Sequence, residues 1–312
     1  MAAAPAELST FPQDSCLRGK GNLRISEFLY DAAQTLEQAG IECPRLEAEH
    51  LLATALGVER KRLYLEMGAL LTDAEVSRAR ELLGLRATRF PLQYITARVD
   101  FLGLEFLIRQ GVFIPRPETE LLVAEAMALI RGIDSPRVLD VGTGSGVIAI
   151  SLAASIPNAS VQALDISSLA IDVARVNAAK HGVEDRVRFF HGDFCQRDLF
   201  STFDAEFFSG RVDLIISNPP YVPTSEIPAL APEIEKYEPQ EAIDGGPDGL
   251  KYVRAILERV PALVKADAWI ALEIGAGQAQ MTREISAAAG LSEVRIVRDM
   301  AGIERVFIAR KV

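Results

Sequence analysis

The chain has 312 residues, of which 49% are hydrophobic and 24% are charged, and its formal net charge is −10. This length predicts about two domains, and the acidic balance argues against a nucleic-acid binder, because such proteins hold phosphates with a surplus of lysine and arginine. Three cysteines without a C-x-x-C pair and three histidines without an H-E-x-x-H pattern argue against a disulfide framework and a zinc centre, so no metal is expected.

Residues 1–22 carry prolines, glycines and scattered polar residues, and they are predicted to form a disordered lead. This segment lacks the charged and then apolar order of a secretory signal. The sequence has no run of about eighteen uncharged apolar residues, which is the length that a membrane helix needs. We therefore expect a cytoplasmic protein that makes no membrane contact.

Residues 23–90 have the periodicity of helices and are predicted to form a small helical domain. Three helices are expected, bounded by a Ser26 N-cap and Gly40, by Pro44 and Gly57, and by the capping box Thr72-Asp73-Ala74-Glu75 and Leu85. Two interpretations of this domain stay open: a helical bundle without chemistry of its own, or a module that docks a substrate.

Residues 91–116 change to an extended pattern and are predicted to form a β-hairpin linker. Its expected strands include Gln93–Thr96 and Phe101–Ile108, with breaks at Gly103 and Gly111. Pro117 then suits the first turn of a helix. Glu118 and Glu120 either line a ligand pocket or stabilise the positive end of that helix.

Residues 117–312 alternate short apolar strands with helical segments, which predicts an α/β fold with a mostly parallel sheet covered by helices on both faces. The seven expected strands are 138–141, 161–164, 187–190, 212–217, 268–274, 294–297 and 305–308, with helices over 148–154 and 167–180 between them.

A glycine-rich turn follows the first of these strands and has the order Gly142-Thr143-Gly144-Ser145-Gly146. Glycines at this position let the backbone approach a ligand at the carboxyl end of the sheet. Val147 stands where a dinucleotide fingerprint needs its third glycine, and no lysine follows to hold a triphosphate. Asp140, just before the turn, would repel a pyrophosphate and attract an ammonium group.

Acidic and aromatic residues follow the next two strands. Asp165 ends the second strand, where a carboxylate can accept both hydroxyls of a ribose. Asp193 and Phe194 follow the third strand, where the carboxylate can accept the adenine amino group and the ring can stack on the base. A nucleoside that carries a cation and no phosphate fits this set, so S-adenosylmethionine is the predicted cofactor, although a purely structural turn is the alternative for the glycines.

The motif Asn218-Pro219-Pro220-Tyr221 follows the fourth strand. An amide or nucleobase NH2 group is a poor nucleophile, and the Asn218 side-chain oxygen and the Pro219 carbonyl can each accept one of its N–H bonds. Pro220 stiffens the loop, and Tyr221 offers a flat face to a planar substrate. The motif therefore predicts methylation of a planar nitrogen; a rigid structural turn is the alternative.

Taken together, the sequence resembles the bacterial peptide chain release factor N5-glutamine methyltransferase family over roughly residues 24–312. The resemblance includes Pro91–Ile95, Phe113–Glu120, Asp140–Gly146, Asp165, Asn218–Tyr221, Glu238-Pro239, Asp244–Leu250, Glu273–Gly275 with Gln278, and Arg298-Asp299 with Glu304–Val306. Ala97 departs from it, because the family usually has glycine there, and Met300 replaces a commoner tyrosine or leucine.

This resemblance implies a Rossmann-like class I methyltransferase domain with seven strands, preceded by the helical docking domain and the hairpin linker. It implies that class 1 peptide chain release factors are the substrate, that Asn218 and Pro219 bind the glutamine of their Gly-Gly-Gln motif, and that the glycine turn and Asp165 bind the cofactor. A monomer is expected. We also expect residues 222–247 to form an ordered loop over the substrate, with an unstructured insertion as the alternative.

Two other functions remain open on the sequence alone. An amino-methyltransferase that acts on adenine or cytosine in DNA or RNA would use the same motif, but it would need a basic surface and a means of extruding a base. The densest basic run, Arg60-Lys61-Arg62, is more typical of a solvated helix start. A binding module that has kept the fold without catalysis is the other alternative.

Overall fold

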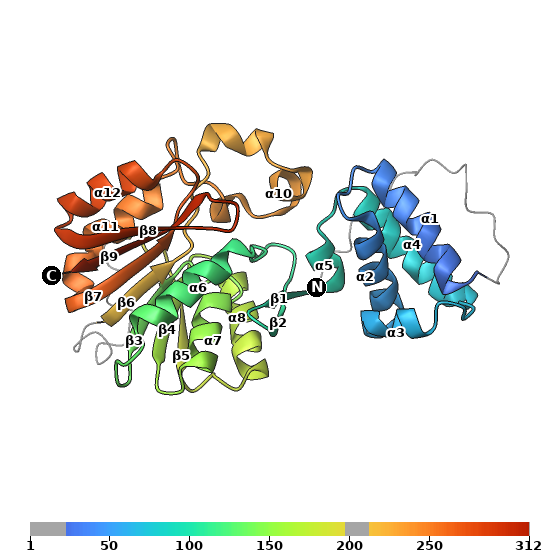
Figure 1. Ribbon diagram of the computed structural model, residues 1–312, viewed down its shortest axis with the longest axis horizontal. Coiled ribbons are helices and arrows are strands. Elements are labelled where there is room, and N and C mark those ends of the chain that lie inside the picture. Colours follow the sequence, from blue (N-terminus) through green and yellow to red (C-terminus); the bar gives the residue numbers. More distant parts are fainter. Residues whose placement is uncertain (1–22, 197–211, 312) are drawn as a thin grey trace, which may run out of the picture. The chain divides into compact units, whose positions relative to one another are not determined.

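The computed structural model describes residues 23–196 and 212–311, so the predicted lead over residues 1–22 lies outside the described residues. The chain divides into two compact units, residues 1–88 and residues 89–312, and Figure 1 shows their elements. In the described part of the chain, no helix has both the length and the apolar character required to cross a membrane.

The first unit is helical, as expected, with α1 (Ile25–Gln38), α2 (Pro44–Leu56), α3 (Arg60–Leu65) and α4 (Asp73–Ala87). The capping box of α4 is confirmed, because the Thr72 hydroxyl accepts the Glu75 N–H and the Glu75 carboxylate accepts the Thr72 N–H at 2.7 Å. The Ser26 cap is wrong. The N-cap is Arg24, two residues earlier, and helix α1 starts at Ile25; the Glu27 carboxylate accepts the Arg24 N–H at 2.9 Å.

The linker region differs from the prediction in one element. Residues expected as its first strand form a short helix, α5 (Leu92–Thr96), while the hairpin consists of β1 (Arg98–Phe101) and β2 (Leu104–Leu107). Pro91 begins this turn, and its carbonyl accepts the N–H groups of Tyr94 and Ile95. Helix α5 ends at Ala97, whose φ of 56° lies in the left-handed region that glycine adopts more easily.

All seven predicted strands of the second unit are confirmed. They are β3 (Arg137–Val141), β4 (Ser160–Asp165), β5 (Val187–His191), β6 (Val212–Ser217), β7 (Val264–Glu273), β8 (Leu291–Arg298) and β9 (Glu304–Lys311). They form one sheet in the order β5-β4-β3-β6-β7-β9-β8, parallel from β5 to β7, with β9 antiparallel to both of its neighbours.

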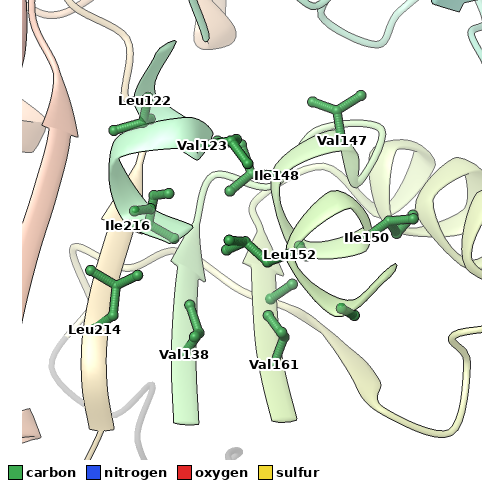
Figure 2. Close-up of a cluster of buried hydrophobic side chains, with 14 of the residues drawn as sticks. Leu122, Val123, Val138, Val147, Ile148, Ile150, Leu152, Val161, Leu214 and Ile216 are labelled. Carbon is green, nitrogen blue, oxygen red and sulfur yellow. The ribbon is translucent and has the colours of Figure 1, made fainter. Parts of the chain in front are cut away.

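Helices cover both faces of this sheet (Figure 1), and each face has its own core. On one face α6 (Glu118–Leu129) and α7 (Val147–Ser155) pack on β3, β4 and β6; Figure 2 shows Val123 and Ile148 from these helices above Val138 and Ile216 of the strands. On the other face α11 (Lys251–Leu263) packs on alternate residues of the same strands, such as Leu139. This alternation follows from the two-residue period of a strand.

The remaining elements are α8 (Ser168–Lys180), α12 (Ala279–Ala288), α10 (Pro232–Tyr237) and the short helices η2 (Thr224–Ala229) and η3 (Gln240–Ala242). The segment 222–247 is thus an ordered run of short helices. Because β3 pairs with β4 on one side and with β6 on the other, the chain order of the sheet reverses between β3 and β6. In open α/β sheets, ligands bind at the carboxyl ends of the strands at such a switch point.

Candidate functional site

A cavity of roughly 1080 Å³, open solvent at its mouth included, lies at the carboxyl ends of β3, β4, β5 and β6. Most predicted site residues line it: Gly142, Thr143, Gly144, Ser145, Asp165, Asp193, Phe194, Asn218, Pro219 and Pro220. Asp140, Gly146 and Tyr221 do not line the cavity.

The glycine turn has the geometry that its sequence requires. Gly142, Gly144 and Gly146 have φ values of 75°, 56° and 87°, which non-glycine residues rarely adopt. A Cβ atom on Gly146 would lie 2.8 Å from Ile150 Cδ1 and 3.1 Å from Ala174 Cβ, so only glycine fits between α7 and α8. Gly146 therefore brings the helices together and shapes the turn from outside the cavity.

Asp140, the residue before Val141 and the glycine turn, contacts the turn through a hydrogen bond. Its side chain is fully buried and accepts a hydrogen bond of 2.7 Å from the Thr143 hydroxyl. Burial raises the pKa of Asp140 to about 7. This hydrogen bond fixes the turn, and the predicted attraction of Asp140 for an ammonium group stays a prediction.

Asp165 lies beside the glycine turn, where its carboxylate accepts the Gly144 N–H at 2.8 Å and the Ser167 N–H at 2.9 Å. These bonds hold the side chain against the glycine turn and leave further lone pairs for ribose hydroxyls. Burial raises the pKa of the Asp165 carboxyl. Nearby, the buried Ser145 hydroxyl lines the cavity and has no hydrogen-bond partner among the described residues, so it is available to a ligand.

Phe194 and Asp193 form the third part of the wall, in the loop after β5. The Arg259 guanidinium of α11 lies 5.3 Å from the centroid of the Phe194 ring and donates hydrogen bonds of 2.7 Å and 2.9 Å to the carbonyls of Cys195 and Gln196. Asp193 accepts the Cys195 N–H at 2.8 Å. Arg259 therefore anchors this loop and presents Phe194 to the cavity, a role that the sequence did not indicate.

The Asn218 loop lies directly beside the glycine turn. The Ser217 hydroxyl donates a hydrogen bond of 2.6 Å to the Val141 carbonyl, and a Cβ atom on Gly142 would lie 4.0 Å from the Asn218 carbonyl oxygen. The Asn218 side-chain nitrogen donates to the Thr119 hydroxyl at 2.9 Å. No described residue donates to the Asn218 side-chain oxygen, which leaves that oxygen for a substrate.

Two residues at the site had no assigned role in the sequence. Thr119 lines the cavity, and Glu273, at the end of β7, is fully buried behind it. Glu273 accepts the Thr119 hydroxyl at 2.7 Å and the Tyr221 hydroxyl at 3.2 Å. Burial raises the pKa of Glu273 to about 7. Thr119 lies between the two glutamates of the Pro-Glu-Thr-Glu motif, and its position in that motif is the sequence feature that could have indicated it.

Neither of those glutamates lines the cavity. Glu118 is exposed, while Glu120 accepts the Leu102 N–H at 2.8 Å and so joins α6 to the hairpin. The helix-start interpretation of the two glutamates agrees with their position in the first turn of α6.

The segment after the motif is tied to it through backbone contacts. Val222 pairs with Asp244, and the Gln278 side-chain nitrogen donates to the Tyr221 carbonyl at 2.8 Å. A Cβ atom on Gly249 would lie 2.3 Å from that same carbonyl oxygen, so glycine is required there. Glu241 of this segment lines the cavity. The segment therefore forms part of the cavity wall.

An ion pair between a half-buried arginine and a buried glutamate anchors the middle of the segment. The Glu238 carboxylate pairs with the Arg116 guanidinium and accepts the Ile114 N–H at 3.2 Å. Arg116 also lies over the Phe113 ring at 4.9 Å from its centroid, and Phe113 lines the cavity. These contacts bring the Pro115-Arg116-Pro117 and Glu238-Pro239 motifs together, although they are far apart in the sequence.

The sheet order, the glycine turn at its switch point and the carboxylate after β4 define a class I S-adenosylmethionine-dependent methyltransferase. Residues 27–96 match the model described as the PrmC N-terminal domain, and residues 104–234 match the methyltransferase small domain. The cofactor of this class is S-adenosylmethionine, and the lining residues fit it, since they offer acceptors and an aromatic ring but no cluster of phosphate-binding cations.

The chain belongs to the release factor glutamine methyltransferase family. It is 40% identical over 271 residues to the release factor glutamine methyltransferase of Geobacter sulfurreducens, covering 87% of this chain and 91% of that one. It is 37% identical over 288 residues to that of Moorella thermoacetica, covering 92% and 98%. The solved hMettl16 catalytic domain in complex with a MAT2A 3′UTR hairpin shares the fold, with a TM-score of 0.52, 16% identity, and 78% and 83% of the two chains covered.

Proposed function

We propose that this protein transfers a methyl group from S-adenosylmethionine to the side-chain amide nitrogen of the glutamine in the Gly-Gly-Gln motif of class 1 peptide chain release factors. The observation that carries the proposal is the free Asn218 side-chain oxygen at a cavity beside the glycine turn, in a chain of this family. The helical unit is then the part that docks on the release factor away from the acceptor loop.

We assign cofactor binding to three walls of the cavity. The glycine turn lets the backbone approach the cofactor, Asp165 accepts the ribose hydroxyls, and Phe194 stacks on the adenine. When bound, the cofactor supplies a sulfonium methyl group that is open to nucleophilic attack. The residues of the chain orient the acceptor against that methyl group.

The Asn218 oxygen and the Pro219 carbonyl each accept one N–H bond of the glutamine amide. Two acceptors in these positions favour pyramidal geometry at the nitrogen as the N–C bond forms and the C–S bond breaks. The two prolines hold the Pro219 carbonyl in place before the substrate arrives, which avoids reorganisation during the reaction. The methylated nitrogen loses one proton to solvent, so no strong general base is required.

The direct test is transfer of labelled methyl from S-adenosylmethionine to a purified class 1 release factor, beside its Gly-Gly-Gln to Gly-Gly-Ala variant and duplex DNA. Label on the wild-type factor alone supports the proposal. Label on DNA instead would move the assignment to nucleobase methylation. Asn218→Ala is expected to lower the rate at least about a hundredfold, because it removes one of the two acceptors.

A further inference from the structure

Two buried side chains lie behind the catalytic loop and contact no reacting atom in the mechanism above. Thr119, in the first turn of α6, is 2% exposed, and Glu273, at the end of β7, is 0% exposed. A chain of hydrogen bonds runs from the Asn218 side-chain nitrogen to the Thr119 hydroxyl at 2.9 Å and from that hydroxyl to Glu273 Oε2 at 2.7 Å.

The direction of this chain follows from the number of protons available. Above about pH 7, where Glu273 is ionised, its carboxylate has no proton to donate, so the single hydroxyl proton of Thr119 points to Glu273. The Thr119 oxygen is then only an acceptor toward Asn218. A side-chain amide can satisfy an acceptor only with its NH2 group, so its oxygen must face the opposite way.

This orientation is the one that methyl transfer needs. The acceptor nitrogen of the substrate carries two N–H donors, which require oxygens on the protein side. A reversed Asn218 amide would present its own NH2 group to those donors, and neither group could then form the hydrogen bond. An asparagine amide alone has little preference between the two orientations, because its oxygen and nitrogen ends have nearly the same shape.

We propose that Thr119 and Glu273 are positioning residues that lock the Asn218 side-chain amide with its oxygen toward the substrate nitrogen. The inference rests on the proposed function, since it takes Asn218 as the acceptor of the substrate N–H bond. Tyr221 has a matching place in the network, because its hydroxyl donates to the other oxygen of Glu273 at 3.2 Å. One carboxylate thereby fixes the Asn218 and Tyr221 ends of the same four-residue motif.

The principal test compares Thr119→Val, which keeps the side-chain shape without the hydroxyl, with Thr119→Ser, which keeps the hydroxyl. Rates are measured with the full chain and a purified release factor at saturating S-adenosylmethionine, and cofactor affinity is measured by calorimetry. We expect Thr119→Val to lower kcat about tenfold or more, with the KM for release factor and the cofactor Kd within about twofold of wild type. Thr119→Ser is expected to restore kcat to within about twofold.

Glu273→Gln is the second variant. It keeps the inference testable if Thr119→Val does not fold. The Thr119 and Tyr221 hydroxyls donate to different oxygens of Glu273, and in glutamine one of these positions is an NH2 donor, so only one hydroxyl keeps its acceptor. The Asn218 amide is then held in its orientation in only part of the population. We expect a severalfold fall in kcat with unchanged cofactor affinity. A wild-type kcat in both variants would overturn the inference, and so would equal losses of kcat and cofactor affinity, which indicate a general structural role. Failure of the proposed function is distinguishable, because the wild-type enzyme would then leave the release factor unlabelled.

Discussion

The raised pKa of Glu273 is expected to lower the stability of the fold at a pH where its carboxylate supports activity. Burial raises its pKa from 4.5 to about 7, even though Thr119 and Tyr221 donate hydrogen bonds to it and Arg305 opposes the shift. The folded protein therefore binds a proton at Glu273 over a pH range in which the unfolded chain has already released it. Above that range, folding keeps a charge buried that water would solvate better.

The sign and size of the effect follow from this difference. Because the folded state binds more protons than the unfolded state between about pH 4.5 and pH 7, stability falls as the pH rises through this window and stays low above it. A shift of this size corresponds to about 3 kcal/mol at 25 °C. Glu273→Gln carries no charge at any pH, so we expect its stability advantage over wild type to grow by about 2 kcal/mol between about pH 5.5 and about pH 8.

The assay is urea unfolding followed by the fluorescence of Trp269, which is the single tryptophan of the chain and lies on β7 with Glu273. Glu258→Gln, an exposed position on α11, is the matched control and is expected to show no growing advantage. If the gap between Glu273→Gln and wild type is the same at both pH values, folding does not raise the proton affinity of Glu273 and the reasoning fails.

Three further predictions concern the cavity. Asp165→Asn is expected to weaken cofactor binding about tenfold in calorimetry, because a carboxamide has one acceptor oxygen where the carboxylate has two. Arg259→Ala is expected to raise the cofactor Kd severalfold without changing kcat at saturation, since the loop after β5 loses two hydrogen bonds. Gly249→Ala is expected to abolish methyl transfer, because its Cβ would lie 2.3 Å from the Tyr221 carbonyl oxygen; Gly277→Ala, with a similar φ and no atom within 4 Å, is the control.

The outcomes that contradict these predictions are distinct. An unchanged cofactor Kd in both Asp165→Asn and Arg259→Ala would contradict the placement of S-adenosylmethionine in this cavity. Equal losses of activity in Gly249→Ala and Gly277→Ala would show that backbone strain, and not contact with the catalytic loop, is responsible.

The strands and the glycine turn were predictable because their causes are local. A run such as Leu214-Ile215-Ile216 is buried on both faces, as expected for a central parallel strand, and the positive φ angles of the turn explain its glycines. Helices α11 and α12 were not predicted. The short helix α5 was mistaken for a strand because its β-branched and aromatic residues favour extended structure, while the turn that begins at Pro91 overrides that preference.

Site residues could be predicted from the sequence only where they end or directly follow a predicted strand. Asn218, Asp165 and Phe194 line the cavity, as that rule expects, and their roles in binding stay predictions. The partnership of Thr119 and Glu273 was not visible, because these residues are 154 positions apart and either one alone is an ordinary helix-start or strand-end residue.

The sheet register explains how such distant residues meet. Strands β6 and β7 are parallel neighbours, and Ser217 pairs with Leu272, so the next residues along, Asn218 and Glu273, lie at the same carboxyl edge of the sheet. Helix α6 contacts β7 and brings Thr119 between them. Once ionised, a buried carboxylate at this point opposes folding, yet in that form it is an acceptor with no proton to give, which is what a fixed amide orientation requires. An amide in its place would relieve the folding cost and lose that constraint, so stability and activity at Glu273 are expected to change in opposite directions.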